Sequence, residues 1–244
     1  MQKATLLTGL LILLASPLSA QKAKPLPNDL KWMTQSIEYA AVCVQTYRAA
    51  WRAVKASAAK ESRNWVVVLD VDETVLDNSP YALERTALDS GFTMASWANW
   101  VLRKEAGLVP GAKAFIDSVR TLGPKAHIAY ITNRRYEREA ATIENLQKYG
   151  LFQEDDIMLT RKGPEDTKEK RRECLRRGTG RCSKHGPLVI LAFIGDNIRD
   201  FFEVYGMEKA RIYREQLLPK DKNWGTRFFM IPNPNYGSWQ RDYR

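Results

Sequence analysis

The chain has 244 residues, of which 44% are hydrophobic and 27% charged, with 14 glycines and 11 prolines. This composition excludes a disordered or fibrous chain and is typical of one globular domain with a sizeable core. The formal net charge of +10 favours anionic ligands. The basic residues concentrate in residues 162–184 without interleaved aromatic side chains that could stack on bases, so we expect no nucleic-acid polymer as a partner.

The first twenty residues have the pattern of a secretion signal. Lys3 supplies a positive start, residues 6–15 form an apolar run, and Leu18, Ser19 and Ala20 form a small-residue cleavage site. The run is too short to span a bilayer stably, and no later apolar stretch is long enough. We therefore expect cleavage near Ala20, no stable membrane anchor afterwards, and a periplasmic or secreted product. A permanent N-terminal anchor is the alternative.

Residues 21–244 are expected to form a single domain that begins with a long helix. After a Lys- and Pro-rich lead-in at residues 21–27, Asn28 or Asp29 is placed to cap a helix that runs to about residue 60. Apolar residues at helical spacing predict which face packs on the core. These residues are Trp32, Ile37, Ala41, Val44 and Trp51.

Strand and helix patterns then alternate along the chain. Apolar segments of strand length occur at residues 65–69, 126–131, 156–159 and 188–194, and helical patterns between them occur at residues 112–122, 136–149 and 165–177. This alternation predicts an α/β fold with a doubly wound parallel sheet. In such sheets the ligand crevice lies beyond the carboxyl ends of the strands. Residues 79–107, together with the N-terminal helix 28–60, are predicted to form a small helical cap over that crevice.

Two carboxylates follow the first strand directly, at Asp70 and Asp72. Residues i and i+2 of an extended segment point the same way, so both can face one site. Asp70 could attack phosphorus and form an aspartyl-phosphate, while Asp72 protonates the departing alkoxide and then activates water. An acid at this position must be protonated when substrate binds, which predicts an acidic pH optimum. The alternative is that both residues only cap a turn.

Asp196 and Asp200 follow the last predicted strand, in a Gly-Asp-Asn-x-x-Asp pattern. Their four-residue spacing on an opening helix places both carboxylates on one face. Carboxylate oxygens of this kind suit Mg²⁺. A helix N-cap followed by a first-turn acid is the alternative.

Two further residues could bind a phosphate. Thr132 ends the second strand and offers a hydroxyl beside the amides of a following helix, although such a threonine can also be a simple cap. The second is one lysine of the basic helix at residues 165–177, which could point inward, neutralise the phosphate and hold Asp70; the choice of Lys168 over Lys162 and Lys170 rests on the family resemblance given below. Most lysines of this stretch are expected to be solvated.

Cys43, Cys174 and Cys182 all lie beyond the predicted cleavage site, in a chain bound for a disulfide-permitting compartment. The last two are close enough in sequence to close a short loop. Three cysteines leave one unpaired or paired between chains, and the sequence does not decide the connectivity.

Together, Asp70-Val71-Asp72-Glu73-Thr74, Thr132, Lys168 and Gly195-Asp196-Asn197-x-x-Asp200 resemble the four-motif pattern of haloacid dehalogenase phosphatases. Longer stretches narrow the resemblance to the class C acid phosphatases, the lipoprotein e-type 5′-nucleotidase group. They are LDVDETVLDNSPY at residues 69–81, residues 97–115 with their Pro-Gly-Ala, and PNPNYG at residues 232–237. The resemblance covers residues 32–239.

This resemblance implies a Rossmann-like α/β core with a small helical cap, and a set of residue roles. Mg²⁺ would be held by Asp70, the backbone carbonyl of Asp72, and Asp196, with Asp200 orienting the groups around it. Thr132 and Lys168 would hold the phosphate oxygens that are not transferred. An aromatic pocket for the leaving group would be formed by Tyr81, Trp97, Trp100 and Tyr236, for which ordinary core packing is the alternative.

The sequence thus predicts a magnesium-dependent acid phosphatase that hydrolyses small phosphomonoesters, with nucleoside 5′-monophosphates as the substrates that the resemblance favours. A broad phosphotransferase and a non-catalytic, anion-binding or storage relative are the alternatives. Symmetric association is common enough to lead us to expect a homodimer. The chain departs from the lipoprotein members at Gln21, where a lipid-bearing cysteine would stand, and in the basic extension at residues 174–185.

Overall fold

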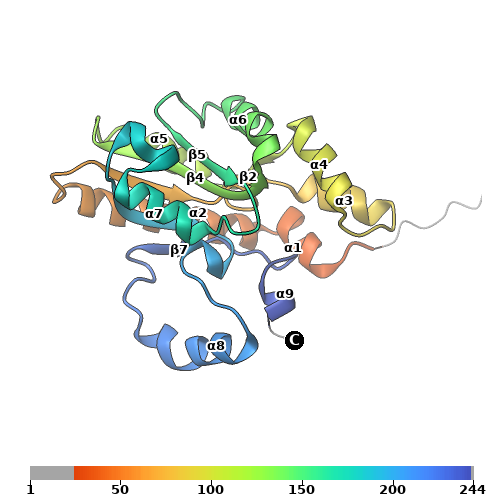
Figure 1. The fold of residues 1–244 in the computed structure, drawn as a ribbon. Coiled ribbons are helices and arrows are strands. Elements are labelled where there is room, and N and C mark those ends of the chain that lie inside the picture. Colours follow the sequence, from red (N-terminus) through yellow and green to blue (C-terminus); the bar gives the residue numbers. More distant parts are fainter. Residues whose placement is uncertain (1–24, 243–244) are drawn as a thin grey trace, which may run out of the picture.

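The computed structural model describes residues 25–242, and its centre is a five-stranded parallel sheet (Figure 1). The strand order is β5-β4-β1-β6-β7. The bounds are Trp65–Leu69 for β1, Ala126–Arg135 for β4, Ile157–Arg161 for β5, Val189–Gly195 for β6 and Phe228–Met230 for β7. The predicted α/β class and parallel sheet are therefore confirmed. The predicted strands are β1, β4, β5 and β6, whereas the three-residue edge strand β7 was not predicted.

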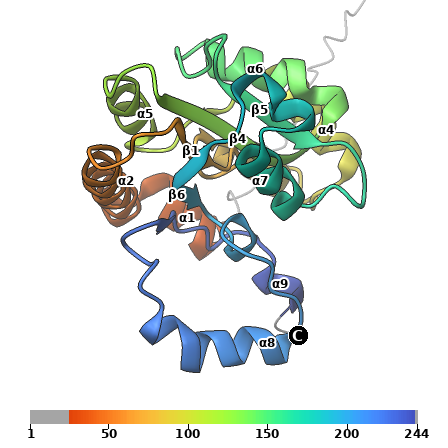
Figure 2. The same ribbon diagram turned by 60° about the vertical axis from the view of Figure 1, so that its left-hand side comes forward.

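Helices cover both faces of this sheet, as a doubly wound arrangement requires (Figure 2). The side chains of β1 alternate between two cores: Val67 and Leu69 pack on one face, and Val66 and Val68 on the other. The first face carries α2 (Ile37–Ala58), α5 (Ala112–Arg120) and α6 (Glu139–Gln147), and the second carries α7 (Lys168–Arg177). Both faces of the central strand are thus buried, which explains its unbroken apolar sequence.

The single N-terminal helix predicted for residues 28–60 is wrong, because two helices occupy this range. α1 (Asn28–Gln35) ends at Ser36, which has an extended backbone and whose side-chain oxygen accepts a hydrogen bond from the Tyr39 amide at the start of α2. The break resets the helical phase, so the predicted core positions Ile37, 83% exposed, and Ala41 face solvent. Trp32, Val44 and Trp51 are half-buried. The buried face of α2 consists of Tyr39, Cys43, Tyr47, Ala50 and Val54.

One of these buried tyrosines connects α2 to the loop after β1. The Tyr47 hydroxyl donates to the Thr74 carbonyl oxygen at 2.5 Å, and both groups are buried. A buried carbonyl that has lost its partner costs about 1–3 kcal/mol. The first long helix therefore supports the segment that carries Asp70 and Asp72.

The insert between β1 and α5 is a compact aromatic unit at one end of the sheet (Figure 1). It consists of the short antiparallel pair β2 (Leu76–Asp77) and β3 (Gly107–Leu108), and of α3 (Ser79–Ala87) and α4 (Met94–Arg103) between them. The ring centroids of Tyr81 and Trp97 are 5.2 Å apart, and those of Tyr81 and Trp100 are 6.1 Å apart. These contacts hold α3 against α4.

The cysteine-flanked extension folds back onto α7. A disulfide joins Cys174 on α7 to Cys182 in the short helix η2 (Gly180–His185), and Cys43 is free and buried. Within η2, the Arg181 guanidinium donates to the carbonyls of Met158 and Thr160, each at 2.9 Å, and pairs with Glu139. Because β5 is an edge strand, its free carbonyls need such partners, and the extension supplies them.

The connection from β6 to β7 contains α8 (Met207–Ile212), and α9 (Trp239–Asp242) ends the described chain. In Figure 2, α8 lies at the far end of an excursion away from the sheet. Within residues 25–242, no helix combines the length and the apolar character needed to cross a membrane. The predicted signal at residues 1–20 lies outside the described residues.

The disulfide should contribute measurably to stability. We expect the double variant Cys174→Ser/Cys182→Ser to lose about 2–3 kcal/mol of unfolding free energy, because the unfolded chain is no longer constrained by the short loop. Urea unfolding followed by tryptophan fluorescence measures this loss. Wild type treated with reductant is the control and should match the variant. An unchanged midpoint in both samples would contradict the structural role of the crosslink.

Candidate active site

Three polar segments meet at the carboxyl edge of the sheet. β1 is central, with β4 and β6 on either side, and Leu69 pairs in register with Tyr130 and with Ile194. Asp70 follows β1, and its amide donates to the Ile194 carbonyl oxygen at 3.0 Å. The residues that follow Leu69, Tyr130 and Ile194 therefore reach the same edge, although they come from distant parts of the sequence.

Three aspartates form a tight group at this edge. One carboxylate oxygen each from Asp70, Asp196 and Asp200 lies within 4.8 Å of the other two. The helix predicted to carry Asp196 and Asp200 is instead a single 3₁₀ turn, η3 (Ile198–Asp200), whose first amides are capped by Asn197. Gly195 makes this turn possible, because a Cβ atom there would lie 2.3 Å from the Cβ of Asp200.

Lys168 is the cation of this group. It is the first residue of α7, after the N-cap Thr167, and its ammonium lies 2.5 Å from Asp70 Oδ1 and 2.5 Å from Asp200 Oδ1. Burial opposes its charge, but the two carboxylates outweigh burial and raise the pKa of Lys168 above its usual value. Lys162 and Lys170, the neighbouring lysines, are exposed. The structure thus brings Lys168 to Asp70 and leaves the other two at the surface.

The three aspartates have the chemistry of a site for a hard divalent cation. Burial raises the pKa of Asp70 to about 7, against the attraction of Lys168, and repulsion by Asp200 and Asp72 adds to the increase. Burial, together with repulsion by Asp200 and Asp70, raises the pKa of Asp196 well above its usual range. One ammonium cannot neutralise three close carboxylates, so the group suits an additional positive charge. Its oxygen ligands suit Mg²⁺.

Asp196 is also oriented by neutral donors. The Thr74 hydroxyl lies 3.3 Å from Asp196 Oδ1, and the Asn233 amide donates to Asp196 Oδ2 at 2.8 Å. Hydrogen bonds of this kind fix the direction of a carboxylate that could ligate a metal. Thr74 and Asn233 were not predicted as site residues.

Asp72 has a different environment from Asp70. Its Oδ1 accepts hydrogen bonds from Arg134 Nε at 2.9 Å and Asn78 Nδ2 at 3.0 Å, and it lies 2.8 Å from Arg134 Nη2. Its Oδ2 has a longer contact, 3.4 Å from the Thr132 hydroxyl. The side chain is 17% exposed. One oxygen of Asp72 is therefore fixed by several contacts, while the other has a single, longer one.

Arg134 is a site residue that the sequence predictions missed. Its side chain is 1% exposed and also donates to Thr142 Oγ1 and Asn78 Oδ1. Residues i and i+2 of a strand share a face, so Thr132 and Arg134 point the same way. That alternation was a signal in the sequence.

Arg171 is a second missed arginine, and it binds the C-terminal part of β4. It is 4% exposed, and it donates to the Thr132 carbonyl at 2.6 Å, the Leu159 carbonyl at 3.0 Å and the Asn133 side chain at 2.9 Å. Burial lowers its pKa to about 10, which leaves it charged at neutral pH. Arg171 therefore ties α7, which carries Lys168, to the segment that carries Thr132.

The predicted aromatic residues occupy unequal positions. Trp100 is 2% exposed, and its indole N–H donates to Asn78 Oδ1 at 2.8 Å. Tyr81 is also buried, and its hydroxyl lies 2.8 Å from Ser96 Oγ. Trp97 is half-buried, and its ring centroid is 5.7 Å from the Arg134 guanidinium carbon. Of the three predicted aromatic residues in the insert, Trp97 therefore has both an accessible surface and a contact with the residues around Asp72.

Tyr236 lies on the Asp196 side of the site. It is 38% exposed, and its amide donates to Asn233 Oδ1 at 3.3 Å, while the same asparagine donates to Asp196. Each of these two aromatic residues is thus connected to an acidic residue through one intervening side chain. Trp97 contacts Arg134, which binds Asp72. Tyr236 binds Asn233, which donates to Asp196.

Most of the chain is similar to known acid phosphatases. A family model described as HAD superfamily, subfamily IIIB (acid phosphatase) matches residues 15–239. The structure of the class C acid phosphatase from Bacillus anthracis is similar over 88% of both chains, with 29% sequence identity and a TM-score of 0.73. The structure of class C acid phosphatase from Bacillus anthracis with tungstate bound is similar to the same extent, with 29% identity, 88% of both chains covered and a TM-score of 0.73.

The raised pKa of Asp70 predicts an unusual pH dependence of stability when divalent metals are removed. The folded protein binds the Asp70 proton more tightly than the unfolded chain does, so this stabilisation is present at low pH and is lost as the pH rises through about 7. We expect the chelated protein to gain up to about 1.4 kcal/mol per pH unit per proton as the pH falls from about 8 to about 6.5. Urea unfolding in chelator measures the gain.

Two controls isolate this effect. Saturating Mg²⁺ should flatten the slope because it favours ionised carboxylates, and Asp70→Asn should remove the part that belongs to Asp70. Burial lowers the pKa of both His127 and His185 below the usual histidine value of 6.5. The folded protein therefore loses stability as the pH falls below 6.5. The measurement stays above this pH. A metal-free slope of the opposite sign would contradict the prediction.

Proposed function

Because the chain belongs to the haloacid dehalogenase superfamily, subfamily IIIB, the acid phosphatases, and is thus a phosphomonoesterase, we propose that it hydrolyses nucleoside 5′-monophosphates with Mg²⁺, through an aspartyl-phosphate on Asp70. The observation that carries this proposal is the division of labour between two acids two residues apart. Asp70 is paired with Lys168 inside the three-aspartate group, whereas Asp72 is held by Arg134 outside it. Two carboxylates in different environments suit two different chemical roles.

In the first step, an Asp70 oxygen attacks the phosphorus of the substrate, and the bond to the leaving oxygen breaks. Asp72 gives its proton to that oxygen, so the alcohol departs neutral. In the second step, Asp72 takes a proton from water, whose oxygen attacks the aspartyl-phosphate. Inorganic phosphate leaves, and Asp70 and Asp72 return to their starting states.

The surrounding groups hold the phosphate and balance its charge. Thr132 and Lys168 would donate to the oxygens that are not transferred. Asp70, the backbone carbonyl of Asp72, and Asp196 would hold Mg²⁺, which supplies positive charge beside the phosphate when bound. Lys168 also contacts Asp200, so Asp200 would keep the ammonium in place beside Asp70. The similar class C acid phosphatase from Bacillus anthracis binds tungstate, a tetrahedral oxyanion like phosphate, which supports a phosphate site in this chain.

The two accessible aromatic residues support a nucleoside as the leaving group. Trp97 and Tyr236 flank the site from the insert and from the segment after β7, and a planar base could lie against either ring. Trp100 and Tyr81 would act behind them, by fixing Asn78 and the insert. Aryl phosphates fit the same chemistry and are the competing substrates in the test.

We also propose that the enzyme acts outside the cytoplasm. The Cys174–Cys182 disulfide suits an oxidising compartment, and the first twenty residues have the pattern of an export signal.

The central test compares wild type with Asp70→Asn on nucleoside 5′-monophosphates, sugar phosphates and an aryl phosphate, with Mg²⁺ or with chelator. We expect the variant to lose at least about a thousandfold in kcat, because removing a nucleophile removes the pathway rather than one contact. Chelator should abolish wild-type turnover. Phosphate release measures both effects, and a variant as active as wild type would overturn the assignment of the nucleophile.

The same assay tests the aromatic pocket. Trp97→Leu should raise KM for nucleotides more than for sugar phosphates, by about tenfold, because stacking on a base is worth about 1–3 kcal/mol. Equal effects on both substrate classes would show that Trp97 serves packing alone.

A further prediction concerns the contact between Arg134 and Asp72. Arg134→Gln should lower kcat by about 10- to 100-fold with a smaller change in KM, because Asp72 loses its two-point contact while the phosphate-binding groups remain. Arg134→Lys is the matched control: it restores the charge without the fork and should recover only part of kcat. Thermal unfolding of each variant checks folding. A change confined to KM would place Arg134 in substrate binding instead.

A further inference from the structure

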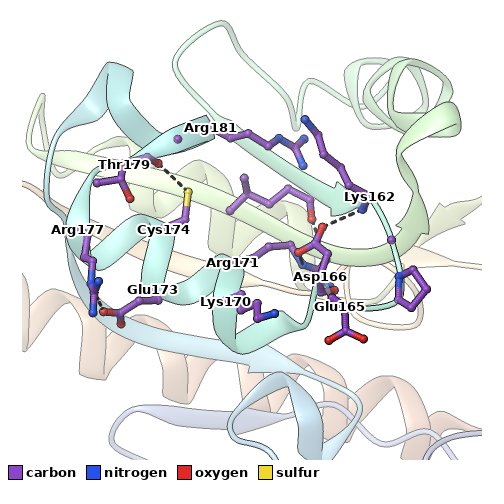
Figure 3. A pocket seen from close by; sticks show the side chains of 14 residues that line it. Lys162, Glu165, Asp166, Lys170, Arg171, Glu173, Cys174, Arg177, Thr179 and Arg181 are labelled. Atoms are coloured by element: carbon purple, nitrogen blue, oxygen red, sulfur yellow. Dashed lines mark hydrogen bonds and ion pairs between the residues drawn. The ribbon is translucent and has the colours of Figure 1, made fainter.

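A basic feature separate from the three-aspartate group lies along α7 (Figure 3). It is a groove of about 730 Å³ between the loop after β5, α7, and the disulfide-linked extension, and we call it the basic groove. Its lining includes Lys162, Lys170, Arg171, Arg177, Thr179 and Arg181. Successive α-helical residues turn by about 100°, so Lys168 and Lys170 point to nearly opposite sides of α7. The groove is therefore distinct from the site at Asp70.

Two of the three acidic residues along the basic groove, Asp166 and Glu173, already have basic partners. Asp166 accepts a hydrogen bond from the Lys162 backbone amide at 2.8 Å and pairs with Arg171 at 3.2 Å. Glu173 pairs with Arg176 and with Arg177. Figure 3 shows the Glu165 carboxylate directed away from Lys162 and Arg181. Asp166 and Glu173 therefore neutralise arginines, and no acid of the lining forms an ion pair with Lys162 or Lys170.

Lys162 and Lys170 have no carboxylate partner among the residues that the structure describes. The ammonium of Lys162 lies 4.6 Å from the centroid of the exposed Tyr136 ring, and the guanidinium carbon of Arg181 lies 5.4 Å from the same centroid. Arg181 has Glu139 as its counter-ion. Two cations at one ring repel each other, and an anion bound between the basic side chains would relieve that repulsion.

The basic groove is built on fixed parts. Its floor contains Arg171, which is buried and held by the carbonyls of Thr132 and Leu159. Its wall at Thr179 and Arg181 belongs to the extension that the disulfide ties to α7. The volume lies in the range of small-molecule sites, and a preformed site loses little conformational entropy when a ligand binds.

We propose that the basic groove is a second anion-binding site, for a phosphate dianion that is free or carried by a small organic molecule. The chain is a phosphomonoesterase, so its own product and its substrates bring this anion to its surface. Lys162 and Lys170 supply the unpaired charge, and Thr179 supplies a hydroxyl donor on the facing wall. This proposal does not depend on the nucleophile or on the substrate class assigned above, because Lys162, Lys170 and Thr179 take no part in that chemistry.

The test is an NMR titration of the ¹⁵N-labelled wild-type protein with inorganic phosphate and, separately, with phenylphosphonate, whose P–C bond is not hydrolysed. The backbone amides of Gly163 and Gly180 report on the basic groove, and that of Gly195 reports on the catalytic edge. We expect saturable shifts at Gly163 and Gly180. Tighter binding of phenylphosphonate than of phosphate would assign the groove to organic phosphates, and the reverse order to the free ion.

Charge-matched variants make the result specific. Lys162→Gln/Lys170→Gln should weaken binding at Gly163 and Gly180 by at least about tenfold, because each lost charged contact is worth at least about a tenfold change in affinity. The Gly195 titration should be unchanged. Lys31→Gln/Lys209→Gln removes two exposed lysines outside the groove and should behave as wild type. Unsaturable shifts, equal shifts with chloride at matched ionic strength, or equal weakening in both double variants would each overturn the proposal.

Discussion

The contact on which the active site depends is the buried ammonium of Lys168 between Asp70 and Asp200. Three aspartates that face one another at the end of a buried strand repel each other, and their charge is costly to bury. One lysine at the first position of α7 reduces that cost while keeping the carboxylates close together. The remaining negative charge is consistent with a metal site. The same excess of buried carboxylate over buried ammonium therefore opposes folding and suits the binding of a cation.

Two buried arginines then set the geometry around this centre, and they do so from different sides. Arg134 fixes one oxygen of Asp72 and contacts the insert through Asn78, whereas Arg171 joins α7 to the carbonyls at the ends of β4 and β5. Asn78 also accepts the indole hydrogen of Trp100. A shift of the insert would thus be transmitted to Asp72 through direct hydrogen bonds. In the proposed mechanism, this coupling makes the aromatic packing of the insert a support for the acid–base residue Asp72.

The sequence was enough to predict the sheet, because a continuous apolar strand that ends in acidic residues reflects burial on both faces and a site at the carboxyl edge. It was also enough to place Asp70, Lys168, Asp196 and Asp200 in one group. It was not enough to predict the break at Ser36, because a single capping serine inside a helical pattern has no periodic signal. Arg134 and Arg171 were missed for another reason: buried arginines look like surface arginines until the carbonyls and carboxylates that bind them are known.

The extension at residues 174–185 shows how one insertion can serve stability and recognition together. Arg181 covers the free carbonyls of the edge strand β5, and this requires its guanidinium to lie beside Glu139 and Tyr136. The same placement brings a second cation to the ring that Lys162 already contacts. An edge strand protected by arginine therefore creates a positive surface as a consequence of its protection. Because Asp166 and Glu173 form ion pairs with other arginines, they do not neutralise that surface. The surface retains its positive charge and can bind an anion.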